Sequence, residues 1–289
     1  MDNSDLRIIY LFTDLLAPLI VGYLLYRHGK ISDALISRIL RLNVIIIYTL
    51  LALMSCWTLP ISWDLALIPI YGVLIVLFPG LIGWAFFIRK YHNALDRGAY
   101  LANAMMSNIT TLGGVCAYII YGEQGFAYAQ IMGIFQTLLL VLAVFPMAQY
   151  YYLQHKNHGR GGKIHIRIAD IFLSWNQLSI LGMAVGLALN AAGVERPPAV
   201  GTAFEGLIHF GAWFGMLPVG ALVNLHRARR YAPYTLDLFA LRFLILPAFM
   251  MAVSYPFVRD PVLLGAILVF SVTPGAINSV TAAKLYHLN

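Results

Sequence analysis

Residues 107–114 read SNITTLGG and residues 271–279 read SVTPGAINS. Each stretch places small and polar residues in the middle of an apolar segment that is otherwise long enough to cross a bilayer. Glycine loosens a helix, and proline interrupts it because proline lacks a backbone N–H donor. Interrupted backbone at membrane depth is tolerated only where it is buried in protein or lines a cavity. The two stretches therefore predict a membrane protein with a site inside the helical bundle.

The composition of the whole chain indicates the same class. The 289 residues are 61% hydrophobic and only 11% charged, with a mean hydropathy of +0.78. Soluble domains carry about 25% charged residues, so a water-soluble protein is excluded. The net charge of +7 does not indicate nucleic acid as a partner, because the basic residues lie between apolar blocks. Cys56 and Cys116 lie within apolar blocks, so we expect neither a disulfide framework nor a metal site.

Nine segments are long and apolar enough to span a bilayer, which takes about 20 residues. Of the 19 Lys and Arg residues, only Arg7, Arg196 and Arg259 fall on one side of the resulting topology. Because basic loops stay cytoplasmic, we expect an integral protein of a bacterial inner membrane, with the N-terminus outside and the C-terminus of this chain inside. The nine predicted spans are 8–26, 38–59, 65–88, 99–121, 126–149, 170–192, 200–224, 237–257 and 262–284.

The interrupted segments occupy corresponding places in two sets of spans. Each is the fourth span of its set. Because the first set has five spans, an odd number, the second set must have the opposite orientation in the membrane. This pattern predicts the inverted-topology repeat of secondary transporters. The predicted parts are a first repeat over 1–150, a cytoplasmic basic linker over 151–168 and a second repeat over 169–289.

An interrupted helix presents half-helix N-termini near the membrane midplane, each with partial positive charge and unpaired N–H groups. Two facing interruptions, which we expect at Gly113/Gly114 and at Thr273–Ala276, would hold a small organic anion such as a carboxylate. The alternative interpretation is that Ser, Thr and Gly only allow helices to pack closely. The candidate binding residues are Asn108, Thr110, Thr111, Gly113, Gly114, Thr273, Pro274, Gly275 and Asn278.

At these residues the sequence resembles the auxin efflux carrier family of the bile acid/auxin transporter superfamily. Asn108 followed by Gly113-Gly114 and Gly122…Gly125 is similar to the first crossover of that family, and Thr273-Pro274-Gly275-Ala276 to the second. The resemblance implies ten helices, divided into a scaffold part that forms homodimers and a transport part that holds both crossovers. It also implies transport of organic anions, including auxins and dicarboxylates.

The sequence departs from the family pattern in two places. Gly114 stands where the family often has proline, so the first interruption would depend on glycine. The chain ends at Asn289, directly after the second crossover, and the tenth helix is absent. We therefore expect the chain to be an incomplete one.

Ionisable residues inside a membrane are functional candidates, because a charge at the bilayer centre costs about 3 kcal/mol or more. Asp14 lies in the first span, and Glu205 and His209 lie four residues apart on one face of the seventh. They are candidates for coupling to H⁺. Alternatively, Asp14 and Glu205 reach the outer interface, and His209 is a neutral hydrogen-bonded histidine. We expect Arg242 to anchor its helix by reaching the inner interface.

The leading hypothesis is a secondary transporter of small organic anions, with no cofactor and with H⁺ or Na⁺ as the candidate coupling ion. Alternatives are a sodium-coupled symporter of the bile acid type and a non-transporting receptor of the same fold. Enzymatic activity is not expected, because Glu205/His209 has no third catalytic partner. The histidines of loop 155–165 match no zinc spacing. We expect Gly182…Gly186 and Gly211…Gly215 to be packing sites within the chain.

Overall fold

The computed structural model describes residues 7, 9–157, 178–223, 229 and 232–288, and the regular elements in these ranges are all helices. Four of the helices are long and apolar enough to cross a membrane, and two shorter apolar helices, Leu178–Ala191 and Pro261–Ser271, accompany them. The predicted class, an all-α membrane protein, is therefore confirmed, whereas the count of nine spans stays a prediction. The four long helices are Asp33–Trp57, Trp63–Lys90, Ile109–Lys156 and Leu236–Ser254.

The longest of these, Ile109–Lys156, contains a sharp bend at Gly122. Gly122 has φ 69° and ψ −156°, a conformation open to glycine but strained for residues with a Cβ atom. The bend lies between the predicted spans 99–121 and 126–149, so it separates what the sequence indicated as two membrane crossings.

The chain divides into two compact units. Unit 1 comprises Met1–Leu65, Thr110–Ile131 and Ser174–Ala228, and unit 2 comprises Ala66–Ile109, Met132–Leu173 and Arg229–Asn289. Each unit therefore combines segments from both halves of the sequence. The predicted linker 151–168 and the start of the predicted sixth span lie largely outside the described residues.

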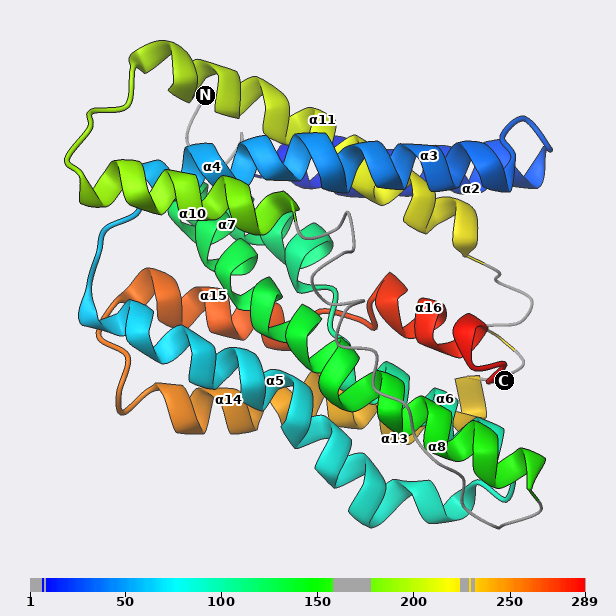
Figure 1. Ribbon diagram of the computed structural model, residues 1–289. Coiled ribbons are helices and arrows are strands. Elements are labelled where there is room, and N and C mark those ends of the chain that lie inside the picture. Colours follow the sequence, from blue (N-terminus) through cyan, green and yellow to red (C-terminus); the bar gives the residue numbers. More distant parts are fainter. Residues whose placement is uncertain (1–6, 8, 158–177, 224–228, 230–231, 289) are drawn as a thin grey trace. The chain divides into compact units, whose positions relative to one another are not determined.

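Unit 1 is a group of closely packed helices, most of which run in pairs. Figure 1 shows α10 alongside α4, and α11 packs against α2. π-helical turns precede α2, α4 and α7, at Leu11–Leu16, Asn43–Ile47 and Ile109–Gly113. The helices are α2 (Ala17–Arg27), α3 (Asp33–Leu42), α4 (Tyr48–Trp57), the first part of α7 (Gly114–Leu139), α10 (Leu178–Ala191) and α11 (Pro198–Leu222).

Glycines bring the paired helices of unit 1 into backbone contact. A Cβ atom at Gly182 of α10 would overlap the backbone carbonyl of Thr49, and one at Gly186 would overlap that of Leu53, both in α4. In the other pair, a Cβ atom at Gly22 of α2 would overlap the carbonyl of Leu217. The predicted role of Gly182…Gly186 as a packing site within the chain is confirmed.

The apolar core of unit 1 lies around α4. Its buried side chains come from α4 with the π turn before it, α7 and α11, and the ring of Phe126 stands edge-on to those of Tyr48 and Phe204. Gly211 and Gly215 of α11 face this region, where a Cβ atom at Gly215 would crowd Thr111. Gly211…Gly215 is therefore also a packing site within the chain, as predicted. The core residues are Ile47, Tyr48, Leu51, Met54, Phe126, Phe204 and Ile208.

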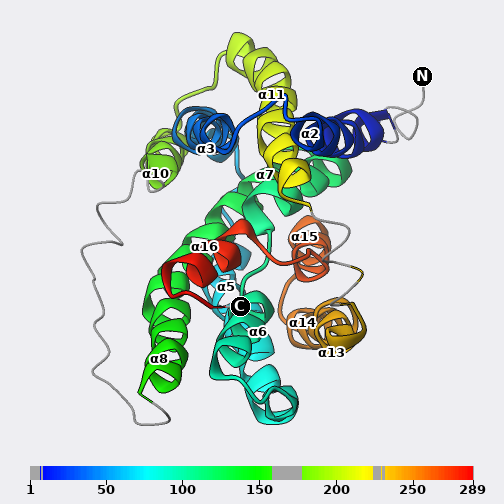
Figure 2. The ribbon, with the colours of Figure 1, turned by 90° about the vertical axis from the view of Figure 1, so that its right-hand side faces the viewer.

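Unit 2 contains the polar stretch 271–279 and residues 107–109 of the first polar stretch. α6 packs against α5 and α8, α14 packs against α5 and α15, and α16 packs against α6 and α8 (Figure 2). Further turns are the 3-10 segments Trp63–Leu67, Ile88–Lys90 and Ala232–Tyr234 and the π segments Gly83–Phe87, Leu140–Val144 and Leu241–Ile245. The helices are α5 (Ile68–Ile82), α6 (Ala94–Met105), α8 (Phe145–Lys156), α13 (Leu236–Ala240), α14 (Leu246–Ser254), α15 (Pro261–Ser271) and α16 (Ile277–Leu285).

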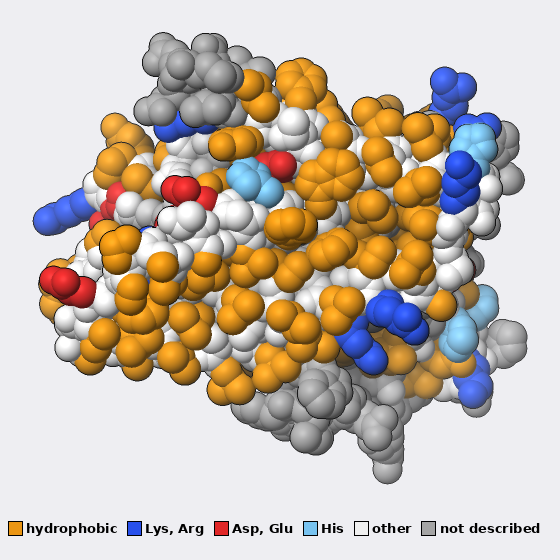
Figure 3. All heavy atoms as spheres, turned by 90° about the horizontal axis from the view of Figure 1, so that it is seen from above, with side chains coloured by type: hydrophobic (Ala, Val, Ile, Leu, Met, Phe, Trp, Pro, Cys, Tyr) orange, Lys and Arg blue, Asp and Glu red, His pale blue; other side chains and the backbone are white. Residues whose placement is uncertain are grey.

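Large apolar side chains are exposed on many of these helices. Figure 3 shows such side chains covering most of the face that it draws. Examples are Ile20 on α2, Leu181 on α10 and Phe210 on α11, which are 57%, 62% and 63% exposed. Extended apolar surface of this kind marks contact with lipid or with another protein, in agreement with the membrane class.

Candidate functional site

Two helices of unit 2 are interrupted where the sequence carries its polar stretches. α6 ends at Met105 and helical structure resumes at Ile109, and α15 ends at Ser271 and α16 begins at Ile277. The second interruption lies where it was predicted. The first was predicted at Gly113/Gly114 and this position is wrong, since Gly113 ends a π turn and Gly114 begins α7. The backbone instead becomes extended at Met106, with φ −96° and ψ 112°.

The two interruptions pair with each other through their backbones. The Asn108 N–H donates to the Pro274 carbonyl at 2.9 Å, and the Ala276 N–H donates to the Met106 carbonyl at 3.0 Å. Together they form an antiparallel bridge between Ser107 and Gly275. Buried backbone groups that have left a helix need new partners, and each interruption supplies partners to the other. This pairing also explains why the first break lies at Met106 rather than at the glycines.

The guanidinium of Arg242 lies against the carboxyl ends of both interrupted helices. Its Nη1 donates to the Ala104 carbonyl at 2.9 Å, and its Nη2 donates to the Ser107 hydroxyl at 2.8 Å. Nη2 also contacts the carbonyl oxygens of Thr273 and Pro274, at 2.7 and 3.3 Å. The residue is 2% exposed. The expectation that Arg242 reaches the inner interface is wrong, because the orphan carbonyls of two helix ends hold the guanidinium inside the unit.

We call the place where Met106–Asn108 pairs with Pro274–Ala276 the crossing. Neutral side chains add further hydrogen bonds there. The amide of Gln136, on α7, donates to the Ser107 carbonyl. The Thr273 hydroxyl donates to the Phe270 carbonyl at 2.8 Å, and the Ser279 hydroxyl donates to the Ala276 carbonyl at 2.7 Å. Gly275 allows a very close approach, because a Cβ atom there would overlap Oδ1 of Asn103 on α6. The crossing is thus a densely hydrogen-bonded polar centre inside an apolar unit.

The predicted binding residues fall into two groups. In unit 2, Asn108 and Thr273 are buried, Pro274 and Gly275 are exposed and Asn278 is half-buried. All of these except Asn278 belong to the paired interruptions. The other four predicted residues belong to unit 1: Thr110, Thr111, Gly113 and Gly114.

Within unit 1, Thr110 and Gly114 have contacts of their own. The carbonyl of Thr110 accepts a hydrogen bond from Gln130 at 3.3 Å. The ring of Phe126 lies 3.4 Å from the place of a Cβ atom at Gly114. The structure therefore brings together the predicted residues of unit 2, and it places Thr110–Gly114 in the packing of unit 1.

Sequence reasoning missed Arg242, Gln136 and Asn103 at the crossing. Gln136 and Asn103 lie in apolar or mixed helices with no pattern that separates them from ordinary packing residues. Arg242 did carry a signal, because it lies within the predicted span 237–257. A basic residue near the end of a span also fits an interfacial anchor, and only the folded chain distinguishes the two roles.

A second polar centre, in unit 1, involves two of the three predicted coupling residues. Nδ1 of His209 lies 2.6 Å from Oδ2 of Asp14, and Asp14 is 5% exposed. The rings of Tyr10 and Tyr118 lie 4.7 and 6.5 Å from the imidazole. Asp14 lies in the π turn Leu11–Leu16, just before Pro18, and a proline ring displaces the carbonyl four residues earlier. Glu205 is exposed.

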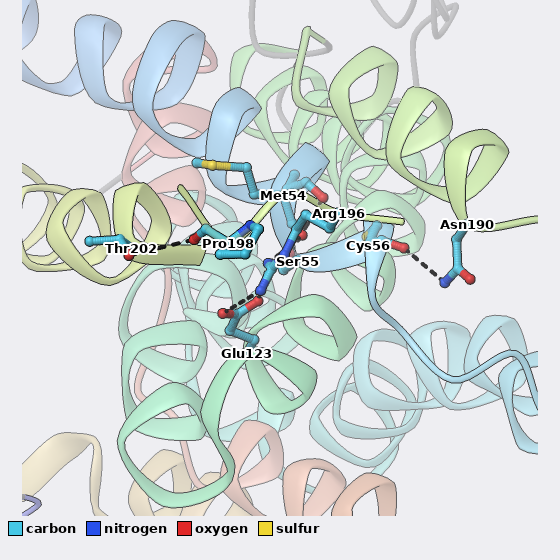
Figure 4. A network of polar contacts seen from close by, with 9 residues as sticks. Met54, Ser55, Cys56, Glu123, Asn190, Arg196, Pro198 and Thr202 are labelled. Atoms are coloured by element: carbon cyan, nitrogen blue, oxygen red, sulfur yellow. Dashed lines mark hydrogen bonds and ion pairs between the residues drawn. The ribbon is translucent and has the colours of Figure 1, made fainter. Parts of the chain in front are cut away.

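A third polar group in unit 1 ties the α10–α11 loop to two helices, as Figure 4 shows. Arg196 contacts both carboxylate oxygens of Glu123, at 2.5 and 3.2 Å, and donates to the Met54 carbonyl at 3.0 Å. Asn190, on α10, donates to the Cys56 carbonyl at 3.3 Å. A bidentate Arg–carboxylate pair of this kind adds geometric specificity to the electrostatic attraction. Glu123 directly follows the bend at Gly122, so the ion pair holds the bent segment to the loop.

Comparison with known proteins adds no identification: no protein-family model matches the chain, and no curated protein matches it. Within the described ranges, no three His, Cys, Asp or Glu side chains come together in a way that could hold a metal ion. Of the loop histidines, His155 lies in the last turn of α8, and His158 and His165 lie outside the described residues.

Proposed function

We propose that the protein is a secondary transporter of small organic anions, of the type that the auxin efflux carrier resemblance implies. The observation that carries the proposal is the reciprocal pairing of the two interruptions, Asn108 to Pro274 and Ala276 to Met106. Paired discontinuous helices are where transporters bind substrates and coupling ions. The proposal is for transport and not for an enzymatic reaction.

The pattern of helix contacts supports an inverted repeat. If spans one to five correspond to spans six to ten, the pair formed by spans one and seven must have a counterpart in the pair formed by spans six and two. The glycine-mediated pairs α2·α11 and α10·α4 are such counterparts. In unit 2, span three meets span eight where the rings of Phe78 and Phe249 stack at 3.6 Å, and span four meets span nine at the interruptions.

The division into units supports the proposed mechanism of alternating access. Unit 1 contains the predicted spans one and two and the described parts of spans six and seven, which are the scaffold in our proposal. Unit 2 holds both interruptions and would carry the substrate. We propose that unit 2 moves against unit 1 and that scaffold helices form a homodimer. We also propose that the N-terminus lies outside a bacterial inner membrane.

The chemistry of the crossing favours an anion. The first turn of α16 begins at Ile277, directly after the second interruption, and a helix N-terminus attracts negative charge. The buried cation of Arg242 increases the local positive potential. Asn108, Thr273 and Asn278 would add neutral hydrogen-bonding groups, and Asn278 lies in that first turn. A carboxylate fits these groups better than a cation or a neutral solute.

We test the proposal by thermal stabilisation of the purified protein with a panel of mono- and dicarboxylates, for the wild type and Asn108→Ala. A ligand that binds the native state raises the melting temperature by mass action. We expect stabilisation by one carboxylate class and a weaker effect in Asn108→Ala. If no carboxylate of the panel raises the melting temperature of a folded protein, the result would count against an anion site.

A flux measurement distinguishes a transporter from a receptor that binds the anion without transporting it. Uptake of the stabilising anion into proteoliposomes is expected for the wild type and is reduced for Asn108→Ala. Stabilisation without uptake would favour the non-transporting receptor. For coupling, the Asp14–His209 pair supports H⁺, because a carboxylate and an imidazole in contact can share a transferable proton.

A further inference from the structure

We infer that the guanidinium of Arg242 fills the place of a coupling cation at the crossing, so that transport by this chain is independent of sodium. That a cation in this place would be a coupling ion rests on the proposed function. The occupancy of the carbonyl oxygens by Arg242 does not, and it can be measured without any anion.

The carboxyl ends of two interrupted helices meet at the crossing. Each such end carries partial negative charge and carbonyl oxygens without intrahelical donors. In transporters with interrupted helices, these carbonyls and the unwound backbone coordinate Na⁺ or H⁺. Here the groups are the carbonyls of Ala104, Thr273 and Pro274 and the hydroxyl of Ser107, and all four are contacted by Arg242.

The match between the guanidinium and these oxygens is geometrical as well as electrostatic. Oxygen ligands from neutral backbone groups suit a hard cation, but here N–H donors approach them at 2.7–3.3 Å. Arg keeps its charge at any physiological pH and donates in a fixed fork. The positive charge at the crossing is therefore permanent and covalently attached, whereas a bound ion would depend on its concentration.

Among the side chains that the structure describes, no acidic one forms an ion pair with Arg242. Within the described part of the chain, its hydrogen bonds all go to carbonyl or hydroxyl oxygens, and Nε is buried with no hydrogen-bond partner there. A buried charge is costly unless it is compensated. Four oxygen contacts at the negative ends of two helices supply that compensation, and they leave no need for a second cation.

The test compares melting temperatures in sodium chloride and in choline chloride at equal ionic strength, with no carboxylate present. For the wild type we expect the same melting temperature in the two salts. Arg242→Ala is expected to melt lower in choline and to regain stability with sodium in a saturable way. Millimolar methylguanidinium, which restores the missing group, should also raise its melting temperature.

The matched control is Arg97→Ala. Arg97 also lies in unit 2 and donates to one backbone carbonyl, that of Tyr91, at 2.7 Å, but it does not contact the interruptions. We expect neither sodium nor methylguanidinium to rescue it selectively. Equal stability of Arg242→Ala and the wild type in choline would overturn the inference. Specific stabilisation of the wild type by sodium would overturn it as well.

If Arg242→Ala does not fold in any salt, the wild type and Arg242→Lys decide. Lysine keeps the charge but loses the fork, so we expect it to melt lower than the wild type and to remain insensitive to sodium. A sodium-stabilised Lys variant would contradict the inference. If sodium stabilises the wild type and the wild type also binds an anion, only the inference about Arg242 fails and the transporter proposal stands. If the wild type is insensitive to sodium and binds no anion, only the transporter proposal fails.

Discussion

Replacing Gly186 by leucine should separate α10 from α4 and destabilise unit 1. A Cβ atom at this position would overlap the Leu53 carbonyl and lie 3.1 Å from the Cβ atom of Cys56. The obstacle includes helix backbone, which cannot turn aside as a flexible side chain can. Gly206, on α11, is the matched control, because nothing lies within 4 Å of a Cβ atom built there.

Both substitutions improve helix propensity, but only Gly186→Leu overpacks a helix interface. Leucine in place of glycine improves helix propensity by about 0.8 kcal/mol at either site. Overpacking a tight interface costs about 1–3 kcal/mol and occasionally more, and a whole leucine between two backbones belongs at the upper end. We therefore expect Gly186→Leu to lose about 2 kcal/mol and Gly206→Leu to gain up to about 0.8 kcal/mol.

The assay is thermal unfolding in detergent, followed by tryptophan fluorescence. For proteins of 150–250 residues, 1 kcal/mol shifts Tm by about 2–4 °C, so the two variants should differ by about 5 °C or more. If Gly186→Leu melts at or above the wild type, α10 and α4 do not approach as closely as described. If Gly206→Leu falls as far as Gly186→Leu, the loss is a general effect of leucine and not of the interface.

Three further predictions concern the polar centres. Pro274→Ala restores a backbone donor and should reduce anion uptake severalfold by weakening the second interruption; full uptake would contradict the role of the break. His209→Gln and Asp14→Asn should each flatten the pH profile of transport, since either change removes one partner of the proton-sharing pair, and an unaltered profile would return the pair to a purely structural role. In a double-mutant cycle on unfolding, Arg196→Ala and Glu123→Gln should show a coupling energy of about 1–2 kcal/mol, as expected for a half-buried, two-pronged ion pair; additive losses would mean that the pair contributes little.

Much of the helical framework could be predicted from the sequence. Apolar length and the lack of charge indicated the membrane class, and small residues spaced four apart indicated where helices pack. The glycine pair Gly182…Gly186 was interpreted correctly because backbone contact requires the absence of a side chain. The second interruption was also placed correctly, because Pro274 cannot donate to a helix.

The rest depends on contacts between residues far apart in the chain. The first interruption was placed at Gly113/Gly114 because glycine weakens helices locally, but the break lies at Met106–Asn108, where pairing with 274–276 competes successfully with helix formation. His209 was paired in sequence with Glu205 on its own helix, whereas its partner is Asp14, 195 residues away. Local spacing contains no information about either contact.

The permanent charge of Arg242 has an electrical consequence for the proposed cycle. If unit 2 crosses the membrane field with its guanidinium, a bound monocarboxylate cancels that charge, whereas the empty unit returns with one net positive charge from this residue. A transmembrane voltage acts on a moving charge with about 2.3 kcal/mol per 100 mV for full passage. The membrane potential would then drive the unloaded return step and leave the loaded step nearly unaffected. A dicarboxylate would distribute the voltage dependence over the two steps with opposite signs.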